Sequence, residues 1–203
     1  VKVCAAVEHG HQRRIIHRDL KPGNILIDEQ GEPRIIDYGV AYAVEIDAAL
    51  TTMAADAGRL VGTIQYMAPE QLDVGGADLD ARCDVYALGA VLYKLVTGRS
   101  MHDLTGLPVL TAVQVVKEEA PARPSTVAPA VKGDLETIIR TAIAKDRMRR
   151  YRSAGSLGRD IVRYLGAKPI KARPAGRLHR ARLFMKRRRT ELVAAIVVLA
   201  VIL

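Results

Sequence analysis

The chain of 203 residues has few large aromatic side chains: Trp is absent and Phe occurs only once. Apolar residues nevertheless make up 49% of the sequence. This length and composition suit one globular domain with some additional sequence, and we expect its core to be aliphatic. The first residue is Val1 rather than Met, so we expect further protein sequence upstream.

Cysteine is also scarce, with only Cys4 and Cys83 in the whole chain. The two lie far apart, and neither belongs to a C-x-x-C pair of the kind that binds zinc. We therefore expect two free, buried thiols in a reducing compartment, with Cys83 acting as inert packing.

Acidic residues are missing from residues 167–190, which contain ten Lys or Arg and no Asp or Glu. Elsewhere 21 basic residues are matched by 22 acidic ones, a net charge of −1 out of the chain's +9. The basicity therefore belongs to one segment near the C-terminus, and it gives no support to nucleic-acid binding by the folded part.

The stretch IIHRDLKPGNILID, residues 15–28, concentrates polar side chains between two apolar runs. The runs at 15–16 and 25–27 have the pattern of short buried strands. A loop held at both ends by strands is a rigid platform of the kind that carries functional residues. The polar residues on this platform are His17, Arg18, Asp19, Lys21 and Asn24.

The rest of the chain reads as mostly helical. A helix should end near residue 11, and strands at 25–28 and 34–37 should form a hairpin. Residues 39–62 lack strong periodicity, so we expect a long functional loop there. Four helices should follow: a buried one at 81–98 with Gly98 as its C-cap, and amphipathic ones at 107–119, 132–144 and 153–165, with a Pro-rich connector at 120–129.

Three of these polar residues, together with Asp37 further along the chain, are the groups that phosphoryl transfer needs. A carboxylate such as Asp19 can orient a hydroxyl and accept its proton, and Lys21 can neutralise charge on the moving phosphate. Asn24 and Asp37 are hard oxygen donors that can hold Mg²⁺. The alternative for all four is a solvated surface loop, which four coincident matches make a poor explanation.

Five motifs occur in order along the chain: HRDLKPGN at 17–24, DYG at 37–39, GTIQYMAPE at 62–70, DVYALGAVLYKLVTGR at 84–99 and KDRMRRYRS at 145–153. By these motifs the chain resembles the protein kinase family. HRDLKPGN fits the family's catalytic-loop pattern H-R-D-L-x-x-x-N, and DYG stands in place of D-F-G. The resemblance covers residues 1 to about 166, and five motifs in the family's order make chance a poor explanation.

The resemblance implies catalytic and cofactor roles. Asp19 would be the catalytic base, and Lys21 would contact the transferred phosphate. Asn24 and Asp37 would hold Mg²⁺, and Leu26 would lie under the adenine ring of ATP. A Lys two residues after the catalytic Asp is the serine/threonine-kinase form of this loop.

The resemblance also implies roles in the activation segment. Thr63 would lie near Asp19 and support the choice of Ser or Thr hydroxyls. Arg18 beside Asp19 is the form regulated by activation-loop phosphorylation, because an Arg can pair with a phosphate. Thr51 and Thr52 are candidate acceptors, with plain loop residues as the alternative.

Four residues would have structural roles in such a lobe. Glu70 would pair with Arg150, and Asp84 would accept hydrogen bonds from the catalytic-loop backbone. Without the motifs, Asp84 and Arg150 would read as charges on helix surfaces. His17 would be a satisfied core histidine and not a catalytic one.

The chain also departs from the family pattern. Tyr38 replaces the usual Phe, which keeps the ring but adds a hydroxyl that needs a partner. There is no G-x-G-x-x-G, no V-A-I-K Lys and no region for its Glu partner. We therefore expect the small lobe to lie upstream of Val1, and this chain alone to bind ATP poorly and to be inactive.

The C-terminal segment combines a basic run, KRRR at 186–189, with an entirely apolar run at 192–203. The basic run alone is compatible with a nucleic-acid patch, a solvated linker or a juxtamembrane anchor. Its position directly before the apolar run favours the anchor. The twelve apolar residues are fewer than the roughly 20 that a span needs, and the run is still continuing at Leu203.

We therefore expect an α+β, mostly α fold: a kinase-like large lobe at 1–166, a basic juxtamembrane linker at 167–190, and the start of a transmembrane helix at 191–203. The resemblance implies a single-pass membrane kinase of the bacterial, eukaryotic-like type, with its kinase domain in the cytoplasm. It would use ATP and Mg²⁺ on Ser/Thr protein substrates, without nucleic acid, and a homodimer is compatible with it. The alternative is a catalytically dead scaffold of the same fold.

Overall fold

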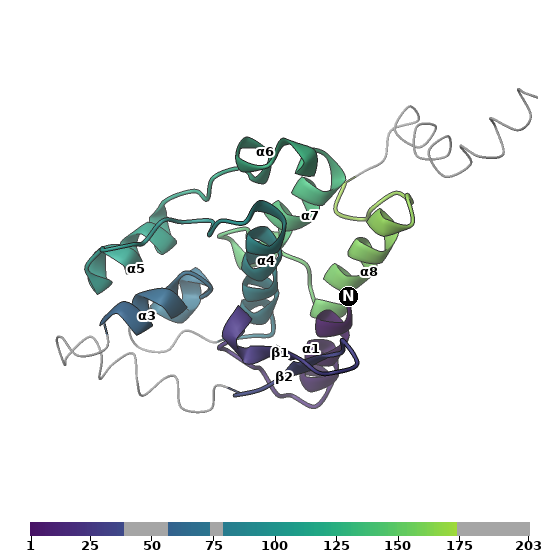
Figure 1. Ribbon diagram of the computed structural model, residues 1–203, viewed down its shortest axis with the longest axis horizontal. Coiled ribbons are helices and arrows are strands. Elements are labelled where there is room, and N and C mark those ends of the chain that lie inside the picture. Colours follow the sequence, from purple (N-terminus) through teal and green to yellow (C-terminus); the bar gives the residue numbers. More distant parts are fainter. Residues whose placement is uncertain (39–56, 74–78, 174–203) are drawn as a thin grey trace, which may run out of the picture.

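The computed structural model describes residues 1–38, 57–73 and 79–173. Thr51, Thr52 and the predicted linker and membrane segment from residue 174 onward lie outside the described residues. The described part is mostly helical, with one two-stranded sheet (Figure 1). In chain order the elements are α1 Lys2–Gln12, η1 Pro22–Asn24, β1 Ile25–Ile27, β2 Pro33–Ile35, α3 Ala57–Ile64, η2 Pro69–Leu72, α4 Arg82–Thr97, α5 Val109–Glu118, α6 Pro124–Val127, η3 Pro129–Val131, α7 Asp134–Ala142, η4 Arg147–Arg149 and α8 Ala154–Leu165.

Helix α4 runs through the middle of the molecule (Figure 1). Its first three turns are buried on every side, which explains why the sequence there is apolar all round. The helix ends at Gly98, which has a φ of 71° and donates its N–H to the carbonyl of Lys94 at 2.9 Å. Glycine adopts this left-handed conformation without strain, so the predicted C-cap is confirmed.

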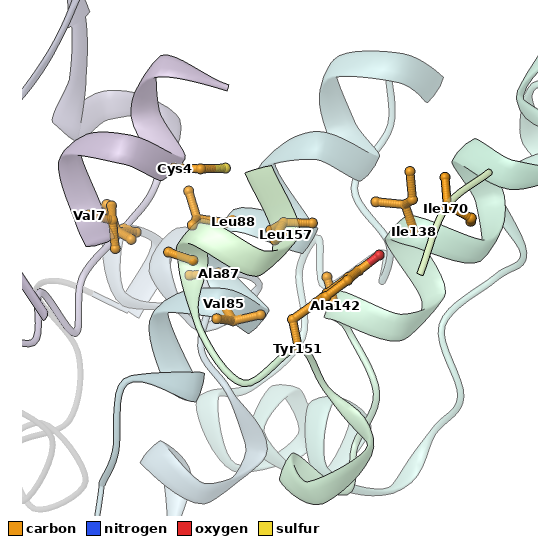
Figure 2. Packing of buried hydrophobic residues seen from close by; sticks show 12 residues of the cluster. Cys4, Val7, Val85, Ala87, Leu88, Ile138, Ala142, Tyr151, Leu157 and Ile170 are labelled. Carbon is orange, nitrogen blue, oxygen red and sulfur yellow. The ribbon is translucent and has the colours of Figure 1, made fainter. Parts of the chain in front are cut away.

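One face of α4 packs with α1, α7 and α8 into the main hydrophobic core (Figure 2). Apolar burial of this kind stabilises the fold by roughly 25 cal/mol per Å² of surface removed from water. The members are the buried residues Cys4, Val7, Leu20, Val85, Ala87, Leu88, Ile138, Ala142, Tyr151, Ala154, Leu157 and Ile170.

The expectation of a purely aliphatic core is wrong on the other face of α4. Tyr86 and Tyr93 have no exposed surface and form the centre of a second cluster. The scarcity of Trp and Phe was a poor guide because Tyr also supplies large rings, and seven of them are present. A ring buries 150–250 Å² whether or not it carries a hydroxyl.

The predicted hairpin is confirmed, with slightly different ends. Strands β1 and β2 pair antiparallel, with Leu26 opposite Arg34. The carboxylate of Asp28 stabilises the turn by accepting the N–H groups of Gln30 at 3.1 Å and Glu32 at 2.8 Å. Strand β2 ends at Ile35, so Asp37 lies just beyond the sheet rather than in it.

The prediction of buried strands on both sides of the polar loop is wrong. Ile15 is 48% exposed and lies in no strand; its N–H donates to the carbonyl of Gly10 at 3.0 Å and closes the end of α1. On the other side, Leu26 and Ile27 are 51% and 65% exposed. The platform is therefore held between a helix end and an exposed hairpin.

Two predicted loops contain helices. Residues 57–62 belong to α3, which packs against α5 through the buried Ile64. The sequence pattern did not predict this helix, because it contains Gly58 and Gly62 and glycine is a poor helix former. The Pro-rich connector at 120–129 contains α6 and leads into η3, where Pro124 and Pro129 occupy first-turn positions that tolerate proline.

Both cysteines are buried and unpaired, as expected. Burial raises the pKa of the Cys4 thiol and, more strongly, that of Cys83. Neither thiol is therefore a ready nucleophile. Among the helices that the structure describes, none has the length and apolar character needed to cross a bilayer.

Gly89 allows α4 and α7 to approach closely. A Cβ atom at this position would lie 2.7 Å from Ala142 Cβ and from Ile143 Cγ2. We predict that Gly89→Ala destabilises the protein by about 1–3 kcal/mol, because the added methyl overpacks the contact. Denaturant unfolding of the complete protein would measure the change.

Gly58→Ala is the matched control, because Gly58 also lies in a helix but has no atom within 4 Å of the added Cβ. This variant should be neutral or more stable by up to ~1 kcal/mol. Equal stabilisation by both substitutions would contradict the close approach of the two helices.

Candidate active site

The carboxylate of Asp19 is the centre of the polar loop. Its Oδ2 lies 2.9 Å from Lys21 Nζ and accepts a hydrogen bond from Asn24 Nδ2 at 2.9 Å. Its Oδ1 is buried and has no hydrogen-bond partner among the described residues. One oxygen is thus fixed, and the other remains available to a further group.

The turn η1 brings Asp19 and Asn24 together although they are five residues apart. Pro22 begins this turn, and Asn24 closes it by donating its N–H to the carbonyl of Lys21 at 3.0 Å. The amide of Asn24 also donates to the main-chain carbonyl of Asp19 at 2.8 Å. Both donors of the Asn24 side chain are therefore directed at Asp19, which leaves its amide oxygen as a potential metal ligand.

Thr63 joins this cluster from the C-terminal end of α3. Lys21 Nζ lies 3.2 Å from Thr63 Oγ1 and therefore links that hydroxyl to Asp19. Thr63 is itself buried. The structure thus brings Asp19, Lys21, Asn24 and Thr63 into direct contact.

Asp37 lies beside the cluster rather than in contact with it. The N–H of Ile36 donates to the carbonyl of Asn24 at 3.0 Å, which places the next residue, Asp37, close to Asn24. Asp37 is exposed and has a φ of 55°. An amide oxygen and a nearby carboxylate form a hard-oxygen donor set that fits Mg²⁺. Leu26 lies on the exposed face of β1.

Asp84, in the first turn of α4, holds the backbone of the polar loop. Its two oxygens accept the N–H groups of His17 and Arg18, each at 2.8 Å. Arg18 has a φ of 67°, a conformation that costs a non-glycine residue energy. The hydrogen bonds to the buried carboxylate compensate for this cost, and they fix the backbone immediately before Asp19.

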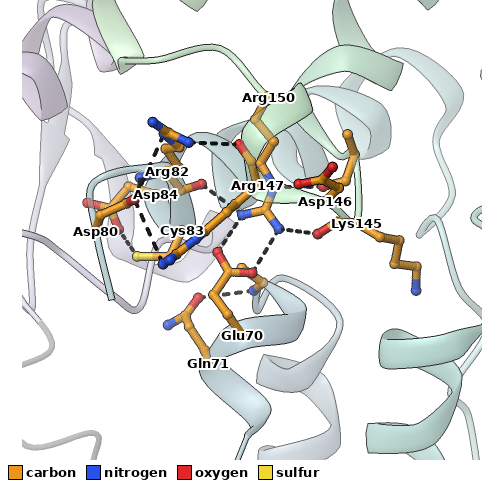
Figure 3. Close-up of polar contacts among 12 residues, drawn as sticks. Glu70, Gln71, Asp80, Arg82, Cys83, Asp84, Lys145, Asp146, Arg147 and Arg150 are labelled. Carbon is orange, nitrogen blue, oxygen red and sulfur yellow. Dashed lines mark hydrogen bonds and ion pairs between the residues drawn. The ribbon is translucent and has the colours of Figure 1, made fainter. Parts of the chain in front are cut away.

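Glu70 and Arg150 form the ion pair that the sequence predicts. Figure 3 shows the guanidinium facing the carboxylate, with Nη1–Oε1 at 2.6 Å and Nη2–Oε2 at 2.8 Å. The Arg150 side chain has no exposed surface and that of Glu70 is 13% exposed. The remaining three N–H groups of the guanidinium donate to the carbonyls of Arg82, Ala144 and Lys145.

The sequence is similar to known proteins over most of its length. Residues 1–157 match the protein kinase domain. The chain belongs to the protein kinase family. The probable serine/threonine-protein kinase PknB of Bifidobacterium longum is 42% identical over 172 residues, which is 84% of this chain and 24% of that protein. The PknB kinases of Mycobacterium leprae and Mycobacterium tuberculosis are 37% and 38% identical over 169 and 170 residues, 83% of this chain in both cases.

The chain therefore spans about a quarter of the length of the kinases that it matches. The expected family resemblance is confirmed.

His17 has a structural position in this kinase lobe. It is 1% exposed, and its Nε2 donates to the carbonyl of Ile36 at 3.1 Å. Its Nδ1 accepts the N–H of Asp19 at 3.4 Å, so both ring nitrogens are used by a single neutral tautomer. The ring also lies 4.5 Å from that of Tyr38, which replaces the usual Phe.

The sequence did not lead us to His11, which lies beside Asp84, the residue that holds the backbone of the polar loop. His11 Nε2 lies 2.7 Å from Asp84 Oδ2, and the His11 side chain is 8% exposed. His11 continues the buried stripe of α1 after Cys4 and Val7, at spacings of three and four residues. A polar residue on such a stripe indicates a buried partner, and that signal was available in the sequence.

We predict that Arg150→Ala destabilises the kinase by roughly 3–5 kcal/mol, because it leaves the Glu70 carboxylate and three carbonyls without their buried partner. Arg34→Ala is the matched control: Arg34 pairs with Asp28 at 2.9 Å, but its side chain is 70% exposed. Such an exposed pair contributes about 0–1 kcal/mol. Chemical denaturation of both variants would compare them, and similar losses would be inconsistent with a buried pair at Arg150.

His11 should act as a positioning residue through Asp84. In the complete protein, His11→Phe should lower kcat about tenfold or more while KM stays within about twofold, since a hydrogen bond to a charged group contributes ~1.5–3 kcal/mol. His11→Gln can still donate to Asp84 and should recover most of kcat. The assignment fails if the Phe and Gln variants have the same kcat, whatever their thermal stability.

Proposed function

We propose that this chain is the large lobe of a serine/threonine protein kinase that transfers the γ-phosphoryl group of ATP to Ser or Thr hydroxyls of proteins. The observation that carries the proposal is the state of Asp19. One oxygen of its carboxylate is fixed by Lys21 and Asn24, while the other is buried without a partner among the described residues. This is the arrangement that a catalytic base requires.

In the proposed reaction, Asp19 Oδ1 accepts the hydrogen bond of the substrate hydroxyl and then its proton. A bond forms between the hydroxyl oxygen and the γ-phosphorus. The bond from that phosphorus to the bridging oxygen breaks, and ADP leaves with the electron pair. Lys21 is close enough to Asp19 to stabilise the negative charge that develops on the transferred group.

The donor set beside Asp19 suits the cofactor that the family uses. We assign the amide oxygen of Asn24 and the carboxylate of Asp37 to Mg²⁺, which would supply charge neutralisation on the ATP phosphates when bound. The exposed side chain of Leu26 on β1 offers an apolar surface for the adenine ring. The ATP-covering small lobe would be supplied by sequence upstream of Val1.

The contact between Lys21 and Thr63 supports a preference for Ser and Thr hydroxyls. It ties the activation segment to the base, so the substrate backbone can be positioned at a fixed distance from Asp19. The cluster favours an enzyme over the alternative of a catalytically dead scaffold, because it leaves one oxygen of Asp19 for a substrate hydroxyl.

The sequence also supports two further features, regulation by phosphorylation and a membrane anchor. Arg18 would pair with a phosphate on Thr51 or Thr52. Residues 191–203 would begin a transmembrane helix with the kinase on the cytoplasmic side, supported by the basic run at 186–189 directly before them. Thr51, Thr52 and residues 186–203 lie outside the described residues, whereas Arg18 lies within them.

In the complete protein, Asp19→Asn should lower the phosphorylation rate of a generic Ser/Thr substrate by about 10²–10⁴-fold, because the amide cannot accept the proton. Thermal unfolding should change little, since the side chain keeps its shape. Glu29→Gln is the matched control, as Glu29 is an exposed carboxylate in the hairpin turn. Near-normal turnover by a folded Asn variant would remove Asp19 from the role of base.

A further inference from the structure

We propose that residues 168–173 form a strap that closes the lobe and is held by the carboxylate of Asp160. Their composition alone predicts a solvated linker. The match to the protein kinase domain ends at residue 157, before this region. The first sign of the strap is Ile170, which is 4% exposed and belongs to the main core with Ile138 and Leu157 (Figure 2).

Asp160 binds the main chain of the strap directly. Its Oδ1 and Oδ2 accept the N–H of Lys171 at 2.8 and 2.9 Å, and Oδ2 also accepts the N–H of Ala172 at 2.8 Å. Asp160 itself has no exposed surface. A buried carboxylate is costly unless it is hydrogen-bonded, so the strap and the carboxylate stabilise each other.

Two side chains complete the surroundings of Asp160. The hydroxyl of Tyr151 lies 3.1 Å from Oδ2, and Arg163 Nη1 lies 3.0 Å from Oδ1. Burial alone would raise the pKa of Asp160, but the amides of Lys171 and Ala172, followed by these side chains, hold it below its ordinary value. The carboxylate is therefore ionised at neutral pH and remains a strong acceptor for the amides.

The strap begins with a turn and ends near α7. At its start, Ala167 has a φ of 48°, and the N–H of Lys168 donates to the carbonyl of Arg163 at 2.8 Å, so the chain turns back from α8. At its end, Arg173 Nη1 lies 4.0 Å from the carboxylate of Asp134, at the start of α7. In Figure 1 the yellow-green chain accordingly returns from the end of α8 toward α7.

The strap changes where a tether to a following segment begins. That tether would start after Arg173 rather than at residue 167, which leaves 17 residues before the segment at 191, or roughly 60 Å when fully extended. In Figure 1 the hairpin β1–β2 lies at the bottom, whereas the strap ends near α7 in the upper half of the picture. A tether to the proposed membrane segment would therefore start at the end of the lobe away from the hairpin.

Hydrogen exchange followed by mass spectrometry tests the strap in the complete protein, with a readout that does not depend on kinase activity. We expect the amides of 168–173 to exchange at least about tenfold more slowly than those of a short unstructured peptide of the same sequence. Asp160→Asn replaces one acceptor oxygen with an NH₂ donor that faces the strap amides, so most of this protection should be lost.

Tyr151→Phe is the matched control, because it removes one hydrogen bond to the same carboxylate without touching the strap. It should keep the protection. If Asp160→Asn fails to fold, Ile170→Ala is the second variant, since it loosens the strap from the core side. The proposal is overturned if the wild-type amides of 168–173 exchange like those of the peptide, or if a folded Asp160→Asn or Ile170→Ala variant keeps full protection.

Discussion

The candidate active site depends on one buried charge, the carboxylate of Asp84 at the start of α4. Three nitrogen donors converge on it: the main-chain N–H groups of His17 and Arg18, and the side chain of His11. Asp84 lies in the first turn of its helix, where the helix dipole and the unpaired N–H groups favour negative charge. An ionised group this deeply buried is stable only while its partners are present, so the loop backbone and the carboxylate must form together.

A second buried charge, Arg150, ties the activation segment to the same end of α4. Its guanidinium binds the carboxylate of Glu70 and the carbonyl of Arg82, the first residue of the helix. Gln71 extends this link by donating to the carbonyl of Arg18 at 2.8 Å. The two segments that meet in the contact of Lys21 with Thr63 are therefore both positioned by the first turn of α4.

The sequence predicted the parts of this arrangement that motifs describe. The spacing of Asp19, Lys21 and Asn24, the helix ending at Gly98 and the pair of Glu70 with Arg150 are all present. Each of these features can be recognised from a few neighbouring residues or from a distinctive spacing between motif residues. The wrong predictions of burial have one cause in common: short apolar runs reveal that a residue is apolar but not what covers it. Burial of Ile15, Leu26 and Ile27 was inferred from such runs and was wrong.

The strap shows the opposite failure, in which composition concealed an ordered segment. Gly166 ends α8, and the basic residues after it suggest a solvated chain. The hydrogen bonds by which Asp160 holds the strap, however, come from main-chain N–H groups, which every residue except proline possesses, so side-chain composition carries no trace of them. Ile170 is the one local signal, an apolar residue among charges. Placing the boundary after residue 173 moves Lys168, Lys171 and Arg173 from the linker into the folded lobe. Part of the basicity that composition assigned to the linker therefore belongs to a segment whose main chain is bound by the folded lobe.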